Sequence, residues 1–172
     1  AREFLSAEYG IPESRVWIGS VARFEPSKRL EVLLEVAARL LAAGRDIHVV
    51  LMGAGCAEGT LRAKVATLGI EMRVTFTGEL PEARRWLSGL DIFCFPSISE
   101  GMPNVLLEAS MAQVPVVAWR LAFVEDLLPD GESARLATSE ATYEMERAIS
   151  DLIDSPMERR RLGLAARTRV TE

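Results

Sequence analysis

The sequence predicts an α/β protein with a doubly wound, Rossmann-like parallel sheet, and three observations support this fold class. Short apolar runs alternate with longer stretches of helical periodicity along the chain. The apolar runs are too continuous for strands with one exposed face, so helices should cover both faces of the sheet and the strands should pair in parallel. The β-α-β order favours right-handed crossovers, as a doubly wound sheet has them.

Five strands are expected, and each is a short apolar run. They are residues 16–22, 47–52, 73–77, 91–95 and 115–119. The first two helices have an apolar face with helical spacing and end at a glycine, Gly44 and Gly69 respectively. Further helices are expected near residues 81–89, 103–113 and 123–128, and at about 139–154 and 156–168.

Length and composition limit the class of protein. The chain has 172 residues, of which 49% are hydrophobic and 26% charged, so a single domain over residues 1–172 is expected. The net charge of -5, from 25 acidic and 20 basic residues, argues against generic nucleic-acid binding. No run reaches the roughly 18 apolar residues that span a bilayer, so no transmembrane segment is expected.

Other features bear on the setting of the protein. Cys56 and Cys94 form neither a disulfide framework nor a zinc-binding set, which favours a reducing compartment such as the cytoplasm. The first residue is not Met and the last segment has no polar tail, so we expect a piece of a longer protein. His48, the single histidine, lies within a predicted strand and is interpreted as a packed side chain.

Ligands of a doubly wound sheet bind beyond the carboxyl ends of the strands, so the loops that follow the strands should hold the functional residues. In the first such loop, Ser27 is expected to cap a helix whose first turn contains Lys28 and Arg29. Cations there add to the positive end of the helix dipole, so together with Arg23 they indicate a phosphate site. Taken alone, they are also compatible with solvated surface charges.

The second loop contains Gly53-Ala54-Gly55, which resembles the start of a dinucleotide-binding fingerprint. The third glycine of that fingerprint would fall at Glu58, so the dinucleotide interpretation fails. We expect these glycines to allow a close approach of backbones at a strand-to-helix turn.

The fourth loop carries the strongest signal. Pro103 suits the first turn of a helix, and the N–H groups near Gly101, Met102, Asn104 and Val105 would then be free to bind an anion.

Two carboxylates flank this helix start. Glu100 lies ahead of it, and Glu108 lies one turn inside, on the same side as Asn104. Because carboxylates bind hydroxyl groups well, the loop suits a ligand with a phosphate centre and hydroxyl-bearing arms. The alternative is ordinary compensation of the helix dipole by Glu100, with Glu108 on the surface.

Residues 99–109 read Ser-Glu-Gly-Met-Pro-Asn-Val-Leu-Leu-Glu-Ala, with a Glu-x7-Glu spacing from Glu100 to Glu108. This segment resembles the donor-site signature of the retaining glycosyltransferases of family 4, group 1, which have the GT-B fold. Further segments recur in the family's order: 21–24 with Lys28, 51–55, 74–78, 91–93, 115–118, Glu125 and 130–131. The resemblance covers nearly the whole chain and implies the C-terminal, nucleotide-sugar-binding half of such an enzyme.

The resemblance also implies catalytic roles. Arg23 and Lys28 would hold the donor pyrophosphate and stabilise the leaving nucleoside diphosphate. Glu100, with the backbone of Gly101 and Met102, would hold hydroxyl groups of the transferred sugar.

The remaining implied contacts are with the nucleoside. Glu108 would hold the ribose hydroxyls, and the base is expected near Gly78, Leu80 and Val105. No metal is expected, since the chain has no Asp-x-Asp motif, and no cofactor is expected beyond the donor substrate, a nucleoside-diphosphate sugar and foremost a UDP-sugar.

The implied activity is transfer of a hexosyl-type sugar to an acceptor with retention of anomeric configuration. The acceptor-binding N-terminal lobe is the expected partner and is absent here, so the isolated chain should bind donor and turn over poorly. Leu121 and Ala122 replace a Gly-Gly pair common in the family, which keeps open an alternative, a non-catalytic nucleotide or nucleotide-sugar binding module. A cytoplasmic location is expected, and peripheral association with the inner face of a membrane through the missing lobe stays open.

Overall fold

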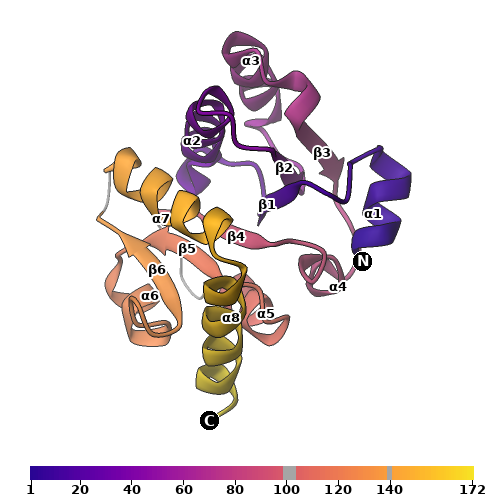
Figure 1. Cartoon of the computed structure of the whole chain (residues 1–172). Coiled ribbons are helices and arrows are strands. Elements are labelled where there is room, and N and C mark those ends of the chain that lie inside the picture. Colours follow the sequence, from indigo (N-terminus) through magenta and orange to yellow (C-terminus); the bar gives the residue numbers. More distant parts are fainter. Residues whose placement is uncertain (99–103, 139–140) are drawn as a thin grey trace.

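A computed structural model describes residues 1–98, 104–138 and 141–172 (Figure 1). Its strands form one sheet in the order β3-β2-β1-β4-β5-β6, and every pair is parallel. The strands are β1 (Val16–Val21), β2 (Ile47–Met52), β3 (Val74–Gly78), β4 (Ile92–Phe95), β5 (Val116–Trp119) and β6 (Ala134–Ala137). The five predicted strands and their parallel pairing are confirmed.

Helices cover both faces of the sheet, as the continuous apolar runs predicted. One face is covered by α2 (Leu30–Ala42), α3 (Glu58–Leu68) and α7 (Thr142–Asp154). The other is covered by α1 (Arg2–Tyr9), α4 (Ala83–Leu87), α5 (Asn104–Met111) and α6 (Ala122–Leu127), and α8 (Pro156–Thr171) crosses to it and packs beside α5 (Figure 1). No helix in the described part of the chain is long and apolar enough to cross a membrane.

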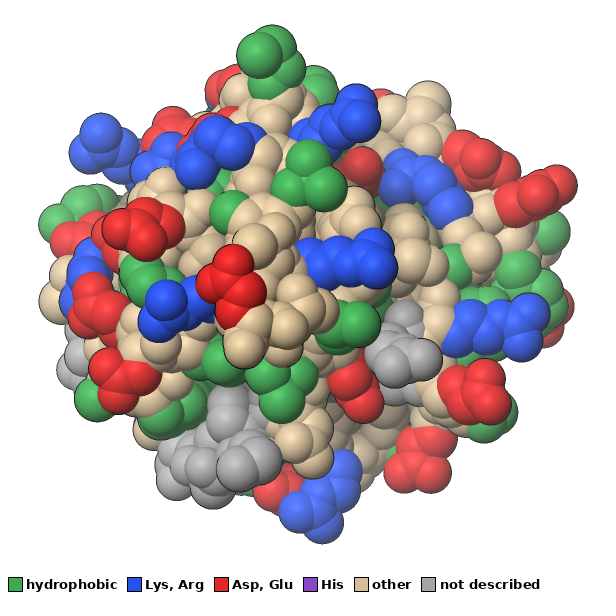
Figure 2. Space-filling model, turned by 90° about the horizontal axis from the view of Figure 1, so that it is seen from below, with side chains coloured by type: hydrophobic (Ala, Val, Ile, Leu, Met, Phe, Trp, Pro, Cys, Tyr) green, Lys and Arg blue, Asp and Glu red, His purple; other side chains and the backbone are tan. Residues whose placement is uncertain are grey.

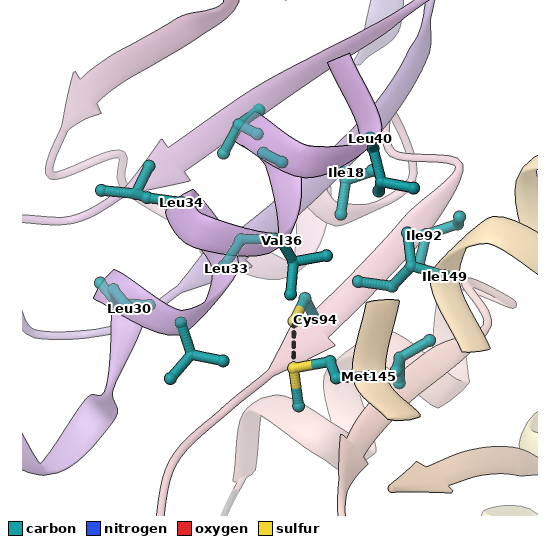
Figure 3. Packing of buried hydrophobic residues seen from close by; sticks show 14 of the residues in the cluster. Ile18, Leu30, Leu33, Leu34, Val36, Leu40, Ile92, Cys94, Met145 and Ile149 are labelled. Carbon is teal, nitrogen blue, oxygen red and sulfur yellow. Dashed lines mark hydrogen bonds between the residues drawn. The ribbon is translucent and has the colours of Figure 1, made fainter. Parts of the chain in front are cut away.

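Alternate strand residues point into the two apolar layers. Ile92 and Cys94 of β4 face α2 and α7, whereas Phe93 faces the opposite layer. The Cys94 sulfur lies 3.8 Å from the Met145 sulfur of α7 (Figure 3), and burial raises the pKa of the Cys94 thiol to about 12. Cys94 therefore acts as a small apolar side chain of the core.

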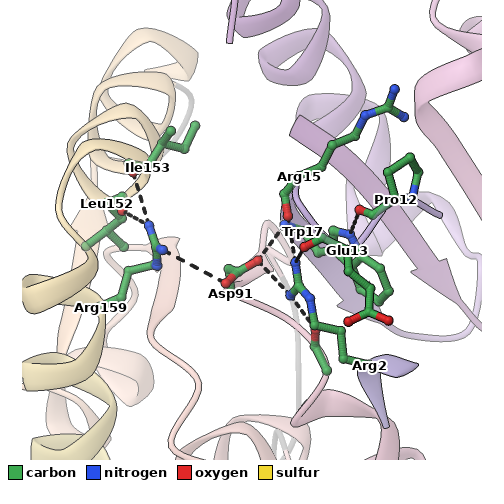
Figure 4. A network of polar contacts seen from close by, with 10 residues as sticks. Arg2, Pro12, Glu13, Arg15, Trp17, Asp91, Leu152, Ile153 and Arg159 are labelled. Atoms are coloured by element: carbon green, nitrogen blue, oxygen red, sulfur yellow. Dashed lines mark hydrogen bonds and ion pairs between the residues drawn. The ribbon is translucent and has the colours of Figure 1, made fainter. Parts of the chain in front are cut away.

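Asp91 connects the start of β4 to the start of β1 at the amino edge of the sheet. Its carboxylate accepts hydrogen bonds from the backbone N–H of Trp17 (2.8 Å) and from Arg2 of α1 (2.9 Å), and Arg159 of α8 lies 4.0 Å away (Figure 4). The Arg2 guanidinium also lies 4.3 Å from the centre of the Trp17 ring. This network fixes α1 and α8 against the start of β1 and β4.

The prediction that Ser27 caps a helix with Lys28 and Arg29 in its first turn is wrong. Pro26–Lys28 form a short 3-10 turn, and α2 begins only at Leu30, after Arg29 in the left-handed region (φ 50°). No side chain caps either element. The Ser27 carbonyl instead accepts hydrogen bonds from the loop after β4, a contact that a local pattern does not encode.

Two elements escaped the sequence patterns. Strand β6 has four residues and is interrupted in apolar character by Arg135, and α1 is one short, mostly exposed helix that buries Leu5. Both are held by tertiary contacts, β6 by pairing with β5 and α1 by Arg2. Short elements of this kind lack the periodicity that identifies longer ones.

Candidate functional site

The strand order reverses between β1 and β4. From β1 the chain continues to β2 and β3 on one side, and from β4 to β5 and β6 on the other. The β1–β4 pairing covers only Ile18 with Ile92 and Gly19 with Phe93, so it ends before the carboxyl ends of both strands. In doubly wound sheets, ligands bind at such a switch point, outside the carboxyl ends of the strands.

Arg23 follows β1 after one residue and is the most accessible cation at this point. Its side chain is 78% exposed and, among the described residues, forms one ion pair, with Glu25 at 3.3 Å. The backbone on both sides of it is anchored to the loop after β2: Ala22 N–H donates to Met52 O (3.1 Å) and Phe24 N–H to Ala54 O (2.8 Å). Phe24 is fully buried, so Arg23 stands on a fixed backbone while its guanidinium reaches solvent.

The glycines of the second loop allow this anchoring. A Cβ on Gly53, whose φ is 138°, would lie 2.0 Å from the Ala22 carbonyl oxygen. A Cβ on Gly55 would lie 2.5 Å from the Phe24 carbonyl oxygen. The predicted close approach of two backbones is confirmed, and it determines where Arg23 lies.

Lys28 ends the 3-10 turn of the same loop and is half-buried. Its N–H donates to Glu25 O at 3.0 Å, which closes the turn. Arg29, grouped with it in the sequence, turns to Glu31 with an N···O distance of 2.7 Å. The structure thus separates the two cations, and Arg23 and Lys28 are the ones that remain at the carboxyl edge.

Helix α5 brings residues of the fourth loop to the other side of the switch point. Asn104 is exposed and Val105 half-buried at its first turn, and Glu108 follows one turn later. Within the described part of the chain, the half-buried Glu108 carboxylate has no hydrogen bond or ion pair. The predicted contacts at Glu100, Gly101 and Met102 lie outside the described residues.

A pocket of about 280 Å³ opens at the carboxyl ends of β1, β2 and β3. Its lining residues are Val21, Ala22, Arg23, Met52, Gly53, Ala54, Glu79 and Leu80. Gly78 has a φ of 70°, and its carbonyl oxygen accepts a hydrogen bond from Gly53 N–H (2.8 Å). Leu80, two residues later, and Arg23 both line this pocket. Residues predicted near a base and near a phosphate therefore share one pocket.

A larger pocket of about 390 Å³ lies between α2 and α3 and contains Cys56. Its walls are mainly apolar, with Pro26, Leu30 and Leu61 among them. None of the predicted site residues lines it, so the size of a pocket does not identify the site here. Cys56 is exposed in this neighbouring pocket, as expected of a bystander thiol.

Sequence reasoning missed two interactions of the loops after β4 and β5. Ser97, only 1% exposed, and Ile98 both contact the Ser27 carbonyl across the switch point. Arg120, at the end of β5, pairs with Glu125 and with Asp130 (2.5 Å).

Asp130 has a second role at the edge of the sheet. Its carboxylate accepts a hydrogen bond from the N–H of Leu136 in β6 at 2.9 Å. The Asp130 hydrogen bond also raises the pKa of Arg120 above its usual range. Glu125 and Asp130 thus hold the β5–β6 edge together.

The surface gives no sign of a polyanion-binding face where it is displayed. Figure 2 shows one face, on which basic and acidic side chains are interspersed. Three of the C-terminal arginines have partners within the protein: Arg159 donates to Leu152 O, Arg161 pairs with Glu158, and Arg169 donates to Asp126 O. Among the described residues, no three His, Cys, Asp or Glu side chains gather as a metal-binding group.

Similar proteins were found at the level of sequence and of structure. The model of the family described as Glycosyl transferases group 1 matches residues 1–169. The 2-deoxystreptamine glucosyltransferase of Streptomyces kanamyceticus is 30% identical over 90% of this chain and 41% of its own length. The MMP alpha-(1->4)-mannosyltransferase of Mycolicibacterium hassiacum is 34% identical over 86% of this chain and 36% of its own length. The chain thus spans about two fifths of these curated relatives.

Two solved structures share the fold. HepE of Anabaena, in complex with UDP and glucose, has a TM-score of 0.88 at 21% identity, covering 98% of this chain and 46% of its own. The C-terminal domain of the group 1 glycosyl transferase LpcC of Francisella tularensis has a TM-score of 0.86 at 22% identity, with 99% of this chain and 91% of that domain covered. The chain therefore belongs to the group 1 glycosyltransferases and has the Rossmann-like α/β fold of the GT-B enzymes.

Proposed function

We propose that this chain is the donor-binding half of a retaining, metal-independent, hexosyl-type glycosyltransferase that uses a UDP-sugar. The observation that carries the proposal is the placement of an accessible cation, Arg23 after β1, and of a carboxylate without a partner among the described residues, Glu108 after β4, on the two sides of the switch point. This arrangement suits a ligand with a phosphate centre and hydroxyl-bearing arms.

Arg23 and Lys28 bind the donor diphosphate in this proposal. When the bond from the anomeric carbon to the β-phosphate oxygen breaks, negative charge develops on the leaving diphosphate, and fixed cations stabilise it. The guanidinium suits two phosphate oxygens at once, and the ammonium supplies a compact charge. The exposed Arg23–Glu25 pair is weak, so exchanging Glu25 for phosphate costs little.

Glu108 binds the ribose. Two neighbouring ribose hydroxyls can donate to the two oxygens of one carboxylate, and this carboxylate has no competing partner among the described residues. Asn104 and Val105, in the first turn of α5, supply N–H groups whose dipoles favour an anion. The nucleoside thus lies along the carboxyl edge, from α5 towards the pocket of Leu80 and Gly78.

The base and the sugar occupy opposite ends of the donor. The base lies at the 280 Å³ pocket beside Leu80, and HepE, which shares the fold, was crystallised with UDP. Glu100, with the backbone of Gly101 and Met102, contacts the transferred sugar, as the family resemblance implies.

In the longer protein, a second, N-terminal lobe binds the acceptor. The chain covers about two fifths of its curated relatives, which leaves room for such a lobe in proteins of their length. The isolated chain accordingly binds donor and turns over poorly. The longer protein works in the cytoplasm, and its N-terminal lobe is the part that would meet a membrane.

Calorimetry in the presence of EDTA tests the proposal with UDP, GDP and ADP. We expect UDP to bind without a divalent metal, and Arg23→Ala and Glu108→Ala each to weaken UDP binding. Loss of a charge-assisted hydrogen bond corresponds to roughly a 10- to 100-fold loss of affinity.

Arg15→Ala is the matched control. Arg15 pairs with Asp46 at the opposite edge of the sheet, at 3.2 Å. Its removal changes the net charge by the same amount as Arg23→Ala without touching the proposed site. UDP affinity that is indifferent to both Arg23→Ala and Glu108→Ala would refute the site. A loss with Arg15→Ala as large as with Arg23→Ala would reduce the effect of Arg23→Ala to net charge alone.

A further inference from the structure

Ser97 connects the two halves of the sheet at the switch point. It follows β4 after one residue, is 1% exposed, and its hydroxyl donates to the Ser27 carbonyl oxygen at 3.4 Å. The backbone N–H of Ile98 donates to the same oxygen at 3.2 Å. One carbonyl of the loop after β1 therefore accepts two hydrogen bonds from the loop after β4.

These hydrogen bonds replace strand pairing. The pairing of β1 with β4 ends at Gly19 and Phe93, so the two strands are no longer paired where they leave the sheet. Ser97 and Ile98 join them again at Ser27, 70 residues from Ser97 in sequence. The separation of the two loops at the carboxyl edge depends on this contact.

The joined carbonyl belongs to the residue directly before Lys28. Lys28 ends the 3-10 turn, which closes through its own N–H to Glu25, and the next residue, Arg29, is in the left-handed region. Both the carbonyl and the N–H group of the Ser27–Lys28 peptide are therefore hydrogen-bonded. This restricts the direction in which the Lys28 side chain leaves the backbone. A shift of the Ser27 carbonyl would move the Lys28 backbone and hence its ammonium group.

We propose that Ser97 is a positioning residue that directs Lys28 to the donor diphosphate by holding the Ser27 carbonyl. The inference rests on the proposed function, because it needs Lys28 at the diphosphate. Ser97 acts through Lys28 and not through Arg23, whose backbone is anchored separately to the Gly53–Gly55 loop. This difference between the two cations makes the proposal testable.

The test is a double-mutant cycle read by calorimetry with UDP. The variants are Ser97→Ala, Lys28→Ala, Arg23→Ala and the two doubles that combine Ser97→Ala with each cation variant. We expect Ser97→Ala to weaken UDP binding about three- to tenfold, the range of one neutral hydrogen bond. In the Lys28→Ala background its further effect should fall below about twofold, whereas in the Arg23→Ala background it should persist in full, since only coupled residues are non-additive.

Ser110→Ala is the control for loss of a buried serine hydroxyl. Ser110 is fully buried, donates to Leu106 O within α5, and lies two residues from Glu108, so it faces away from it. It should leave UDP affinity unchanged. If Ser97→Ala lowers the melting temperature, Ser97→Cys, whose thiol is larger than the hydroxyl but donates a weaker hydrogen bond, should couple to Lys28→Ala in the same direction with a smaller loss of UDP affinity.

The outcomes separate the inference from the proposed function. If Ser97→Ala leaves UDP affinity unchanged, or is additive with Lys28→Ala, the positioning role is wrong even though Arg23→Ala and Lys28→Ala weaken binding. If none of the cation variants changes UDP affinity, the diphosphate site itself fails, and with it the basis of the inference.

Discussion

The two edges of the sheet use charged side chains differently. At the amino edge, Arg2 and Arg159 surround Asp91, and Arg15 and Arg73 both pair with Asp46. At the carboxyl ends of β1 and β4, Arg23 is 78% exposed with a single weak partner, and Glu108 has none among the described residues.

This difference distinguishes charges that stabilise the fold from charges that a ligand could reach. Charges that are paired inside the protein have their partners already, so a ligand would have to displace them. Arg23 has only the exposed, weak pair with Glu25, and Glu108 has no partner among the described residues, so a ligand at these side chains would have little to displace. The same distinction separates Arg120, paired twice after β5, from Arg23 after β1.

Gly53→Ala should have the largest effect, and it acts on the carboxyl edge through the backbone. The added Cβ would lie 2.0 Å from the Ala22 carbonyl oxygen at a φ of 138°. We expect a loss of roughly 3 kcal/mol in the free energy of unfolding, from strain and overpacking. Urea denaturation measures it, and calorimetry should show weaker UDP binding because Arg23 follows Ala22.

Gly59→Ala is its matched control, since Gly59 lies in α3 and a Cβ there meets nothing within 4 Å. Alanine should stabilise this helix by up to about 1 kcal/mol. Equal effects of the two substitutions would contradict the close approach at Gly53.

Asp91→Ala tests the amino edge and should have the next largest effect. It removes the acceptor of Trp17 N–H and the partner of Arg2, and leaves Arg159 without a carboxylate nearby. We expect a loss of about 2–3 kcal/mol in the free energy of unfolding, as for a hydrogen bond to a charged group. UDP affinity measured at a temperature where the variant is folded should not change. A clear loss of UDP affinity would show that the two edges are not independent.

His48 makes stability at the amino half of the sheet depend on pH, and its substitution should have the smallest effect. Its side chain in β2 is 5% exposed, its Nε2 lies 2.8 Å from Thr75 Oγ1, and its Nδ1 has no partner in the described part of the chain. Burial, with the positive charges of Arg15 and Arg73, lowers the pKa of His48 from 6.5 to about 4. The confirmed packing of this histidine in a strand therefore has a consequence for stability.

The sign follows from proton uptake. Between pH 6.5 and 4, His48 is protonated in the unfolded chain but not in the folded chain. The contribution of neutral His48 to the free energy of unfolding is therefore complete above pH 6.5 and is lost on acidification. His48→Gln, which can keep a bond to Thr75, should remove at most about 1.4 kcal/mol of this loss per pH unit. Urea unfolding at pH 7, 6 and 5 compares the two proteins. Parallel stability curves would mean that His48 titrates normally in the fold.

Much of the architecture could be predicted because a strand that is buried on both faces needs a continuous run of apolar residues. The runs at Ile47–Met52 and Ile92–Phe95 are of this kind, and both strands are completely buried. Strand β6 could not be predicted, since four residues around Arg135 carry no such run. The predicted start of α2 was wrong for a different reason. Ser27 has a side chain that often caps helices, but here its carbonyl oxygen accepts hydrogen bonds from a distant loop.

The candidate site divides in the same way. Arg23, Lys28 and Glu108 could be proposed from residue type, motif spacing and the family resemblance, since spacing along one loop or helix is a local property. Ser97 could not be named, because its hydrogen bond to Ser27 joins residues 70 positions apart. The ion pairs of Arg120, and the lack of a partner for Glu108 in the described part of the chain, depend likewise on what surrounds these side chains in space.

Local patterns in the sequence account for the order and type of the long elements, the close glycine turn at Gly53, and the residue types of the candidate site. Tertiary contacts account for the strand order, which puts the loop of Lys28 beside the loop of Ser97, and for which of the described charges have partners inside the protein. The physical reason is range. Periodicity and turn chemistry act over a few residues, whereas a hydrogen bond or ion pair across the switch point exists only when the whole sheet has brought its partners together.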